Sequence, residues 1–396
     1  MKKWSVLYLF FTVFFVFGCS SDRQEDGLPC IDVTKDYPEK EIVLTDIADV
    51  TFLCLDSDNE DFLYKGIINC ITENTIVIAD RFSGEILLFS KDGKPKSHFN
   101  NIGQGPEDYI NAHRVIYDEE ADEVFVYAFG KGVLVYTYNG KYKRKIDLPE
   151  GFFSNYFYFF DSESFLLNNA VLQFNSNLER EVAEQADPSA QLYNHPFIRI
   201  SRADGKVLDY PELPTNDIDL KMNADGRLVS IITNPIVSTE KGFLLCNPAT
   251  DTVFLYDKNK VLTPVICKTP LVKDLNPMVI MNNCLDYGRY QFMDIVTVQF
   301  APDLPTPNPT KYLIRNKKTG EVFRQKIILP DFKGKEVVVS VRNSRSCEKG
   351  VLFEFELVEL KQAYRENKLS GKLKELVSAL NEDEDNNVFM FVDFKE

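Results

Sequence analysis

The sequence predicts an all-β protein folded as a six-bladed β-propeller, closed by N- and C-terminal strands and carrying a small helical insertion in the last blade. Two observations support this prediction. Short runs of alternating β-branched and aromatic residues are separated by turns rich in Gly, Asp and Asn. The same order of strands and turns then returns about every 40–50 residues, which is typical of four-stranded blades around an axis. A two-sheet sandwich does not explain the repeated turn order.

Residues 1–18 are predicted to be a lipoprotein signal peptide. A basic start, Lys2-Lys3, precedes the apolar run Val6–Phe17, which is too short for a membrane-spanning helix. The run Val16-Phe17-Gly18-Cys19 resembles a bacterial lipoprotein box, and this resemblance implies lipidation of Cys19. An ordinary secretory signal with an unrelated cysteine is the alternative. Acyl chains on Cys19 would anchor the protein to a membrane without spanning it.

Residues 19–40 are expected to form an acylated tether, and residues 41–396 the propeller. The acidic run Ser20–Gly27 resembles the surface-export signal of Bacteroidetes lipoproteins. Asp is absent directly after Cys19, which by the same resemblance disfavours retention in the inner membrane. The expected location is the outer membrane, with the domain periplasmic or surface-exposed.

Composition narrows the class of partner. The chain of 396 residues has 45 Lys and Arg against 60 Asp and Glu, a formal net charge of −15. Nucleic acid is excluded as a partner, because phosphate-backbone binding needs basic patches. The chain has eight cysteines, none in a C-x-x-C spacing, and most sit inside apolar strands. Disulfides are allowed in an oxidising compartment, but the spacing does not assign a pairing.

The first two units show the repeat most clearly. An inner strand, Lys65–Thr72, precedes the stretch Thr75–Phe99, in which three strands are separated by a Ser-Gly turn and an Asp-Gly turn. The second unit, Arg114–Pro149, repeats this order with turns at Phe129–Gly132 and Asn139-Gly140. Further units are predicted from Tyr156, at Ser230–Thr269, at Val279–Pro330 and from Val337 to the C-terminus.

The last unit contains only three strands. The strand Val50–Asp56 near the N-terminus has no local partner and can supply the fourth. Closing the ring in this way would remove exposed strand edges.

Three insertions interrupt the units: Val171–Pro196, with a short helical pattern, the proline-rich Ala301–Thr310, and Leu357–Asn387. The last is predicted to form two helices, with an apolar face of Leu373, Leu376, Val377 and Leu380. Each insertion lies between the second and third strands of its unit. In an up-and-down blade this loop opens on the same face as the blade-to-blade connection, so the longer loops should gather on one face, around the channel mouth.

The opening unit carries a family resemblance. The segment ADRFSGEILLFSKDG, followed by NIGQGPEDY, resembles the first blade of the six-bladed β-propeller lipoproteins of Bacteroidetes, which are relatives of NHL-repeat proteins. The resemblance extends over the mature chain. It implies no assigned reaction, so no catalytic residues are carried over.

Functional residues are expected among the loops of the elaborated face. Asp80 and Arg81 could face a ligand, although a salt bridge or turn cap is the simpler interpretation. The Gly103–Gly105 segment is interpreted as a structural turn and not as a phosphate loop. Three tyrosines could stack on a sugar ring. The candidate ligand-binding residues are Asp80, Arg81, Phe82, Gln104, Asp108, Tyr109, Tyr287 and Tyr290.

No catalytic or metal-binding pattern is visible in the sequence. His98, His113 and His195 are scattered without metal-ligand spacing, and His98 is expected on an outer strand. No G-x-S-x-G elbow occurs. No cofactor is predicted, and calcium or another divalent ion is left open.

Three functions remain at this point. The leading one is a binding or interaction module at the outer membrane for an envelope protein, a peptide or a glycan. The alternative is a propeller hydrolase or lyase with a metal or polar site at the channel mouth. The third is a structural envelope component whose mouth is plugged by the helices of the last unit.

Overall fold

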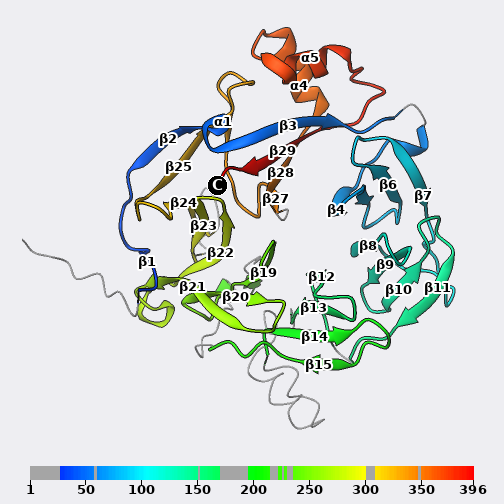
Figure 1. The fold of residues 1–396 in the computed structure, drawn as a ribbon, viewed down its shortest axis with the longest axis horizontal. Helices are drawn as coiled ribbons and strands as arrows, with labels where there is room; N and C mark the ends of the chain where they lie inside the picture. The colour runs from blue at the N-terminus through cyan, green and yellow to red at the C-terminus, as the bar shows by residue number, and fades with distance from the viewer. Residues whose placement is uncertain are drawn as a thin grey trace, which may run out of the picture.

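The computed structural model describes residues 27–57, 60–149, 152–169, 195–214, 222–224, 227–229, 235–299, 308–346 and 349–396. Six antiparallel sheets stand around a common axis (Figure 1). The predicted six-bladed β-propeller is confirmed.

The strands of blades one to three follow one another from the centre of the ring outward. Blade one contains β4 (Ile67–Ile71), β5 (Thr75–Ala79), β6 (Ile86–Ser90) and β7 (Pro95–Phe99). Blade two contains β8 (Arg114–Asp118), β9 (Glu123–Ala128), β10 (Gly132–Tyr136) and β11 (Tyr142–Ile146). Blade three contains β12 (Phe157–Phe159), β13 (Ser164–Asn168), β14 (Phe197–Ser201) and β15 (Val207–Asp209).

Blades four to six have the same order but recruit N-terminal strands. Blade four contains β18 (Ile236–Thr239), β19 (Gly242–Leu245), β20 (Thr252–Asp257) and β21 (Leu262–Thr269). Blade five contains β22 (Val279–Tyr287), β23 (Tyr290–Thr297), β24 (Thr310–Asn316) and β25 (Val322–Ile328), with β26 (Glu336–Val337) beside β25. Blade six contains β27 (Arg345–Ser346), β28 (Gly350–Phe355), β29 (Val388–Phe394) and, from the N-terminus, β3 (Ala48–Cys54).

The ring closes through β3, which pairs antiparallel with β29 along its whole length, from Cys54 opposite Val388 to Ala48 opposite Phe394. This confirms the prediction that an N-terminal strand completes the last blade. Closure stabilises the ring because it satisfies the backbone groups of a strand edge that would otherwise be open.

The chain ahead of β3 forms a belt along the outer edges of blades four and five. Within this belt, β1 (Cys30–Asp32) pairs in parallel with β21, and β2 (Glu39–Val43) pairs in parallel with β25 (Figure 1). A four-residue helix, α1 (Leu44–Ile47), joins β2 to β3. The residues expected as a tether up to position 40 therefore include paired strand. The apolar side chains of Ile31 and Val33 explain this, since both are buried in the core of this half of the ring.

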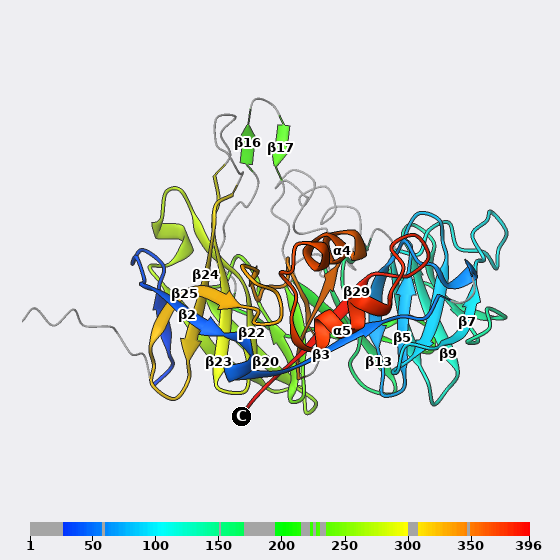
Figure 2. The same cartoon turned by 90° about the horizontal axis from the view of Figure 1, so that it is seen from above.

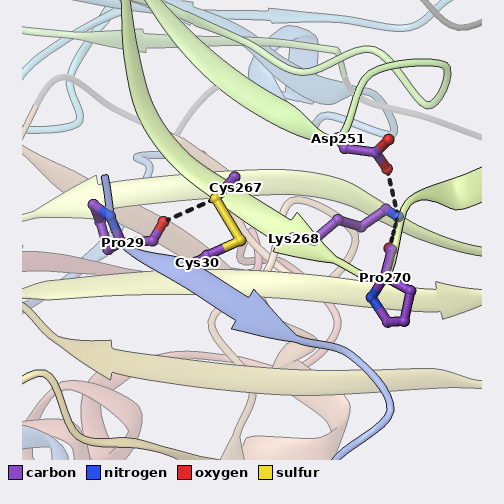
Figure 3. The surroundings of a disulfide bond; sticks show 6 residues. All are labelled: Pro29, Cys30, Asp251, Cys267, Lys268 and Pro270. Atoms are coloured by element: carbon purple, nitrogen blue, oxygen red, sulfur yellow. Dashed lines mark hydrogen bonds and ion pairs between the residues drawn. A yellow bond between two sulfur atoms is a disulfide. The ribbon is translucent and has the colours of Figure 1, made fainter. Parts of the chain in front are cut away.

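A disulfide and a buried ion pair fix the start of the belt. Cys30 of β1 is bonded to Cys267 of β21 (Figure 3). The next residue, Lys268, is fully buried, and its Nζ lies 2.6 Å from Asp251 Oδ1 and donates to the carbonyl of Pro270 at 3.1 Å.

The Gly-containing turns between the third and fourth strands share one geometry in blades one and two. The amide of Gly93 donates to the carbonyl of Ser90, and the amide of Gly140 donates to the carbonyl of Thr137, both at 2.9 Å. Both glycines have a positive φ, 87° and 81°. This conformation is unfavourable for residues with a Cβ, so glycine marks these turns in the sequence.

The insertion of blade six contains two helices, as predicted, namely α4 (Leu357–Arg365) and α5 (Gly371–Ala379). Leu373 and Val377 of the predicted apolar face are completely buried, and Leu376 and Leu380 pack beside them. The helices lie at the outer rim, beyond β3, and not over the centre of the ring (Figure 1). The interpretation in which they plug the mouth is therefore wrong, because their apolar face packs against the outside of the ring.

The remaining elements are short. They are the 3₁₀ helices η1 (Glu60–Phe62) and η3 (Val272–Asp274), and the hairpin of β16 (Met222–Ala224) and β17 (Arg227–Val229). The core lies between the facing sides of neighbouring blades; Val77 and Leu88 of blade one, for example, share a cluster with Val115 and Val126 of blade two.

Candidate functional site

The longer connections open on one side of the ring, which we call the loop face. It carries the turns between second and third strands and the connections between blades. The β16–β17 hairpin, between blades three and four, projects on this side, whereas the C-terminus lies on the other (Figure 2). This hairpin was not predicted, and the Asp-Gly pair at 225–226 was the available signal. The insertion at 171–196 falls mostly outside the described residues, including its helical pattern, and so does most of the insertion at 301–310.

The Asp80 turn joins β5 to β6 on the loop face. Asp80 Oδ1 accepts hydrogen bonds from the amides of Phe82 at 2.9 Å and Ser83 at 3.3 Å. These bonds, with that of Phe82 first, lower the pKa of Asp80. The Asp80 carboxylate therefore caps the turn. Arg81 is exposed, with its guanidinium carbon 5.7 Å from the centre of the Phe82 ring, and Phe82 itself is 83% exposed.

The loop Gly103–Tyr109 is held rigidly beside this turn. Asp108 Oδ2 accepts the amide of Gly105 at 2.8 Å. The Tyr109 hydroxyl donates to the carbonyl of Gly84 at 2.6 Å and accepts the amide of Asn101 at 2.9 Å. Because Tyr109 is completely buried, its ring cannot stack on a sugar. Tyr109 is thus a structural anchor, whereas Gln104 is exposed, as are Pro106 and Glu107 of the same loop.

The two other candidate tyrosines lie on the face of the ring opposite the loop face. Tyr287 and Tyr290 flank the turn between β22 and β23, the first two strands of blade five. Tyr287 is buried and stacks on Phe394 with ring centres 5.4 Å apart. The structure therefore does not bring these tyrosines together with the Asp80 turn, and the expected sugar contact near the mouth does not include them.

Aromatic side chains are exposed on the loop face of blades one and two. Phe129, in the turn between β9 and β10, is 47% exposed and contacts Phe153 edge to face at 4.7 Å. The connection between these blades ties this turn to the Phe82 turn. Its Asn111 Oδ1 accepts the amide of Phe129 at 3.1 Å, and its Ala112 amide donates to the carbonyl of Arg81 at 3.2 Å. We call the turns and connections that carry Phe82, Phe129 and Phe153 the aromatic loops.

The histidines do not form a site together. His113 packs between the rings of Tyr127 and Phe153, and burial, with Arg81 and Arg114 nearby, lowers its pKa to about 4. His98 lies on the outer strand β7, as predicted, 3.3 Å from Glu85. His195 stacks on Tyr210. Within the part of the chain that the structure describes, no group of three or more His, Cys, Asp or Glu is arranged to hold a metal ion.

Two arginines at the inner edge of the ring were not identified from the sequence. Arg114 is the first residue of β8 and Arg345 the first of β27, and both strands begin on the loop face. Arg114 Nε donates to the carbonyl of Asn155 at 3.0 Å, and its guanidinium carbon lies 5.1 Å from the centre of the Tyr156 ring. Each arginine begins an inner strand, which was the only sequence signal available.

Comparison with known proteins assigns the chain to a family. Residues 28–393 match the model of the family described as Domain of unknown function (DUF4934). The chain belongs to this family. No curated protein matches this DUF4934 chain. Among the described residues, no helix is long and apolar enough to cross a membrane.

Solved structures resemble the DUF4934 fold at low identity. A protein described as exported, from Bacteroides fragilis, is 16% identical, with a TM-score of 0.59 over 91% of this chain and 98% of that chain. The Neurospora crassa Pan2 WD40 domain is 9% identical, with a TM-score of 0.34 over 74% of this chain and 73% of that chain. The extracellular domain of a hybrid two-component system from B. thetaiotaomicron is 12% identical, with a TM-score of 0.34 over 69% of this chain and 36% of that chain. The likeness to the exported protein concerns the fold alone.

Proposed function

We infer that the protein is a non-enzymatic binding module of the bacterial envelope. It is anchored at the outer membrane through a lipidated Cys19 and engages an envelope protein, a peptide or a glycan with its loop face. The anchor rests on the resemblance of Val16–Cys19 to a lipoprotein box. The binding role rests on the side chains that the loop face exposes.

The observation that carries this proposal is the exposure of the aromatic loops. Phe82 is 83% exposed and Phe129 is 47% exposed. Large aromatic side chains on the surface cost solvation free energy, and exposed apolar groups that gather on one surface are a common mark of interaction sites.

The support beneath these side chains is rigid. The carboxylate of Asp80 caps the Phe82 turn, and the buried hydroxyl of Tyr109 binds the carbonyl of Gly84 in the same turn. A side chain held on a rigid turn loses little conformational entropy on binding, which favours recognition. The aromatic loops therefore suit a preformed contact surface.

The experiment compares loop-face variants with a matched control on the opposite side. Purified full-length protein, Phe82→Ser, Phe129→Ser and Val261→Ser are tested against an outer-membrane extract, a peptide library and a glycan array. Val261 is 53% exposed in the turn between β20 and β21, on the side away from the aromatic loops. We expect Phe82→Ser to weaken binding roughly tenfold or more, as for an interface hot spot, and Val261→Ser to leave it unchanged. Equal binding by all four proteins would contradict the proposal.

A further inference from the structure

The inner arginines, Arg114 and Arg345, are half-buried and have no acidic partner among the described residues. Four other arginines pair with carboxylates, among them Arg365 with Glu382 at 3.0 Å. Arg199, which is 3% exposed, binds Asp209 at 2.7 Å, Arg202 binds Asp118 at 2.7 Å, and Arg144 forms a two-point contact with Glu123. Arg114 and Arg345 are half-buried, yet neither forms an ion pair with any residue that the structure describes.

The two arginines come together at the inner edge of the ring. Blade one separates blades six and two, so β27 and β8 flank β4 at the centre (Figure 1). Both guanidinium groups act on the same two tyrosines of blade three, Tyr156 and Tyr158, opposing the rise in their pKa values that burial causes. Burial, followed by repulsion from Arg114, lowers the pKa of Arg345. Two positive charges therefore lie within electrostatic reach of each other on the loop side, at the starts of β8 and β27.

The carboxylate of Glu354 does not form an ion pair with these two arginines. Glu354 is the carboxylate that acts on Arg345, but its Oε1 accepts hydrogen bonds from the Tyr64 hydroxyl at 3.1 Å and the Asn387 amide at 2.9 Å. Guanidinium groups stay charged at neutral pH, so the repulsion is present in the folded protein. Half-buried like charges without a counter-ion are unfavourable, and a bound anion would relieve the cost.

We propose that Arg114 and Arg345 form an anion subsite that receives the carboxylate of an acidic saccharide. This proposal rests on the proposed binding function and names its ligand class. A guanidinium presents a planar fork of N–H donors that matches a carboxylate. The exposed rings of Phe82 and Phe129 supply flat apolar surfaces on the same side of the molecule, which suit the apolar face of a pyranose ring.

The test compares two sugars that differ only in whether they carry a carboxylate. The melting temperature of the full-length protein, purified in neutral detergent, is measured at constant ionic strength with D-glucuronate and with D-glucose. These sugars differ in that a carboxylate replaces a hydroxymethyl group. A ligand that binds only the folded state raises the midpoint, so we expect a rise with glucuronate and none with glucose. Inorganic phosphate and polyglutamate are run in parallel.

Substitutions test whether Arg114 and Arg345 bind the carboxylate. Arg345→Gln and Arg114→Gln should each weaken the apparent glucuronate affinity roughly tenfold or more, the usual effect of losing charge-assisted hydrogen bonds. Arg289→Gln, an exposed arginine in the β22–β23 turn, is the matched control and should bind as the wild type does. Without ligand, Arg345→Gln should be at least as stable as the wild type, because one of two repelling charges is removed. Arg345→Lys keeps the charge and should bind more weakly than the wild type.

Several results would overturn the proposal. They are an equal response to glucose and glucuronate, full affinity in Arg345→Gln, or a midpoint raised by phosphate or polyglutamate but not by glucuronate. Failure here would leave the binding function intact if Phe82→Ser still abolished capture of an envelope ligand. Failure of both experiments would reject both.

Discussion

The two halves of the ring protect their outer edges differently. In blades four to six the N-terminal chain covers the edge, through β1, β2 and β3. Among the described residues, blades one to three have no such cover, and their outer strands carry exposed lysines, Lys96 on β7 and Lys143 and Lys145 on β11. Charged side chains on an edge discourage pairing with another chain. We call blades four to six the belted half and blades one to three the bare half. The belted half is covered by a disulfide-linked, hydrogen-bonded segment, whereas the outer strands of blades one and two in the bare half carry charge.

The cores differ in the same way. One cluster of buried residues joins Ile31 and Leu44 of the belt with side chains from blades four, five and six. In the bare half the core is divided into separate clusters between successive blades. Most candidate ligand residues, including Phe82, Phe129 and Arg114, lie in the bare half, and Arg345 lies in the blade that adjoins it. The belt therefore joins three blades into one core, whereas most of the candidate ligand residues lie on blades that it does not cover.

The largest effect on the belted half should follow loss of the buried ion pair. Lys268→Met would leave Asp251 without its 2.6 Å partner in a buried position, and we expect a loss of about 3–5 kcal/mol in the free energy of unfolding. Lys206→Met removes an exposed pair with Asp204 in blade three and should change stability far less, because water screens an exposed ion pair. Denaturant titration measures both. Similar losses in the two variants would remove the contrast between the halves.

A buried amide–carboxyl pair in blade five should make the belted half sensitive to pH. Asn283 Nδ2 donates to Asp294 Oδ2 at 3.0 Å, and among the described residues the other oxygens of both groups, Asn283 Oδ1 and Asp294 Oδ1, have no partner. If Asp294 Oδ1 carried a proton, it could donate a second hydrogen bond to Asn283 Oδ1, and both atoms would then have a partner. Burial raises the pKa of Asp294 to about 7, although the Asn283 bond and Arg342 oppose the rise.

The direction in which stability changes with pH depends on when folded and unfolded Asp294 bind a proton. Between pH 4 and 7 the folded state holds a proton that the unfolded state has lost, so stability falls as pH rises through this range and levels off above it. A rise from 3.8 to about 7 corresponds to about 4 kcal/mol at most. Asp294→Asn can form the same two hydrogen bonds without titrating. The free energy of unfolding, measured at several pH values, should fall between pH 4 and 7 in the wild type but not in this variant. The same pH dependence in both proteins would contradict the assignment.

Removing the disulfide should loosen the belt without dismantling the ring. The double variant Cys30→Ser, Cys267→Ser loses a cross-link between residues 237 positions apart, and we expect it to lose about 2–4 kcal/mol. Reductant should lower the melting temperature of the wild type towards that of the variant and leave the variant unchanged. A reductant effect on the variant would show that another disulfide is involved.

The smallest effects are expected on the loop face of the bare half. Tyr109→Phe removes the hydroxyl that binds Gly84 and Asn101, and should cost about 1–3 kcal/mol because those groups are left without a partner. Phe82→Ser should change stability by no more than about 0.5 kcal/mol, since the side chain is 83% exposed. Thermal melts measure both. A large loss in Phe82→Ser would show that Phe82 supports the fold and would weaken its assignment to binding.

Local patterns in the sequence determined the blade count, the strand order and the two helices of blade six. Strand alternation and Gly-containing turns such as that at Gly93 are set by neighbouring residues, so they are legible without knowledge of the rest of the chain. The closing strand was also predictable, because a unit with three strands and an unpaired strand elsewhere fit each other.

The functional surface depended on the tertiary structure. Asp80, Arg81 and Phe82 were found because a turn between strands is local, but the sequence could not show that Tyr109 is buried or that Tyr287 lies on the other side of the ring. The pairing of Cys30 with Cys267 and the meeting of Arg114 with Arg345 join residues far apart in the chain. Ring closure decides which distant inner and outer strands become neighbours, and no local pattern records that choice.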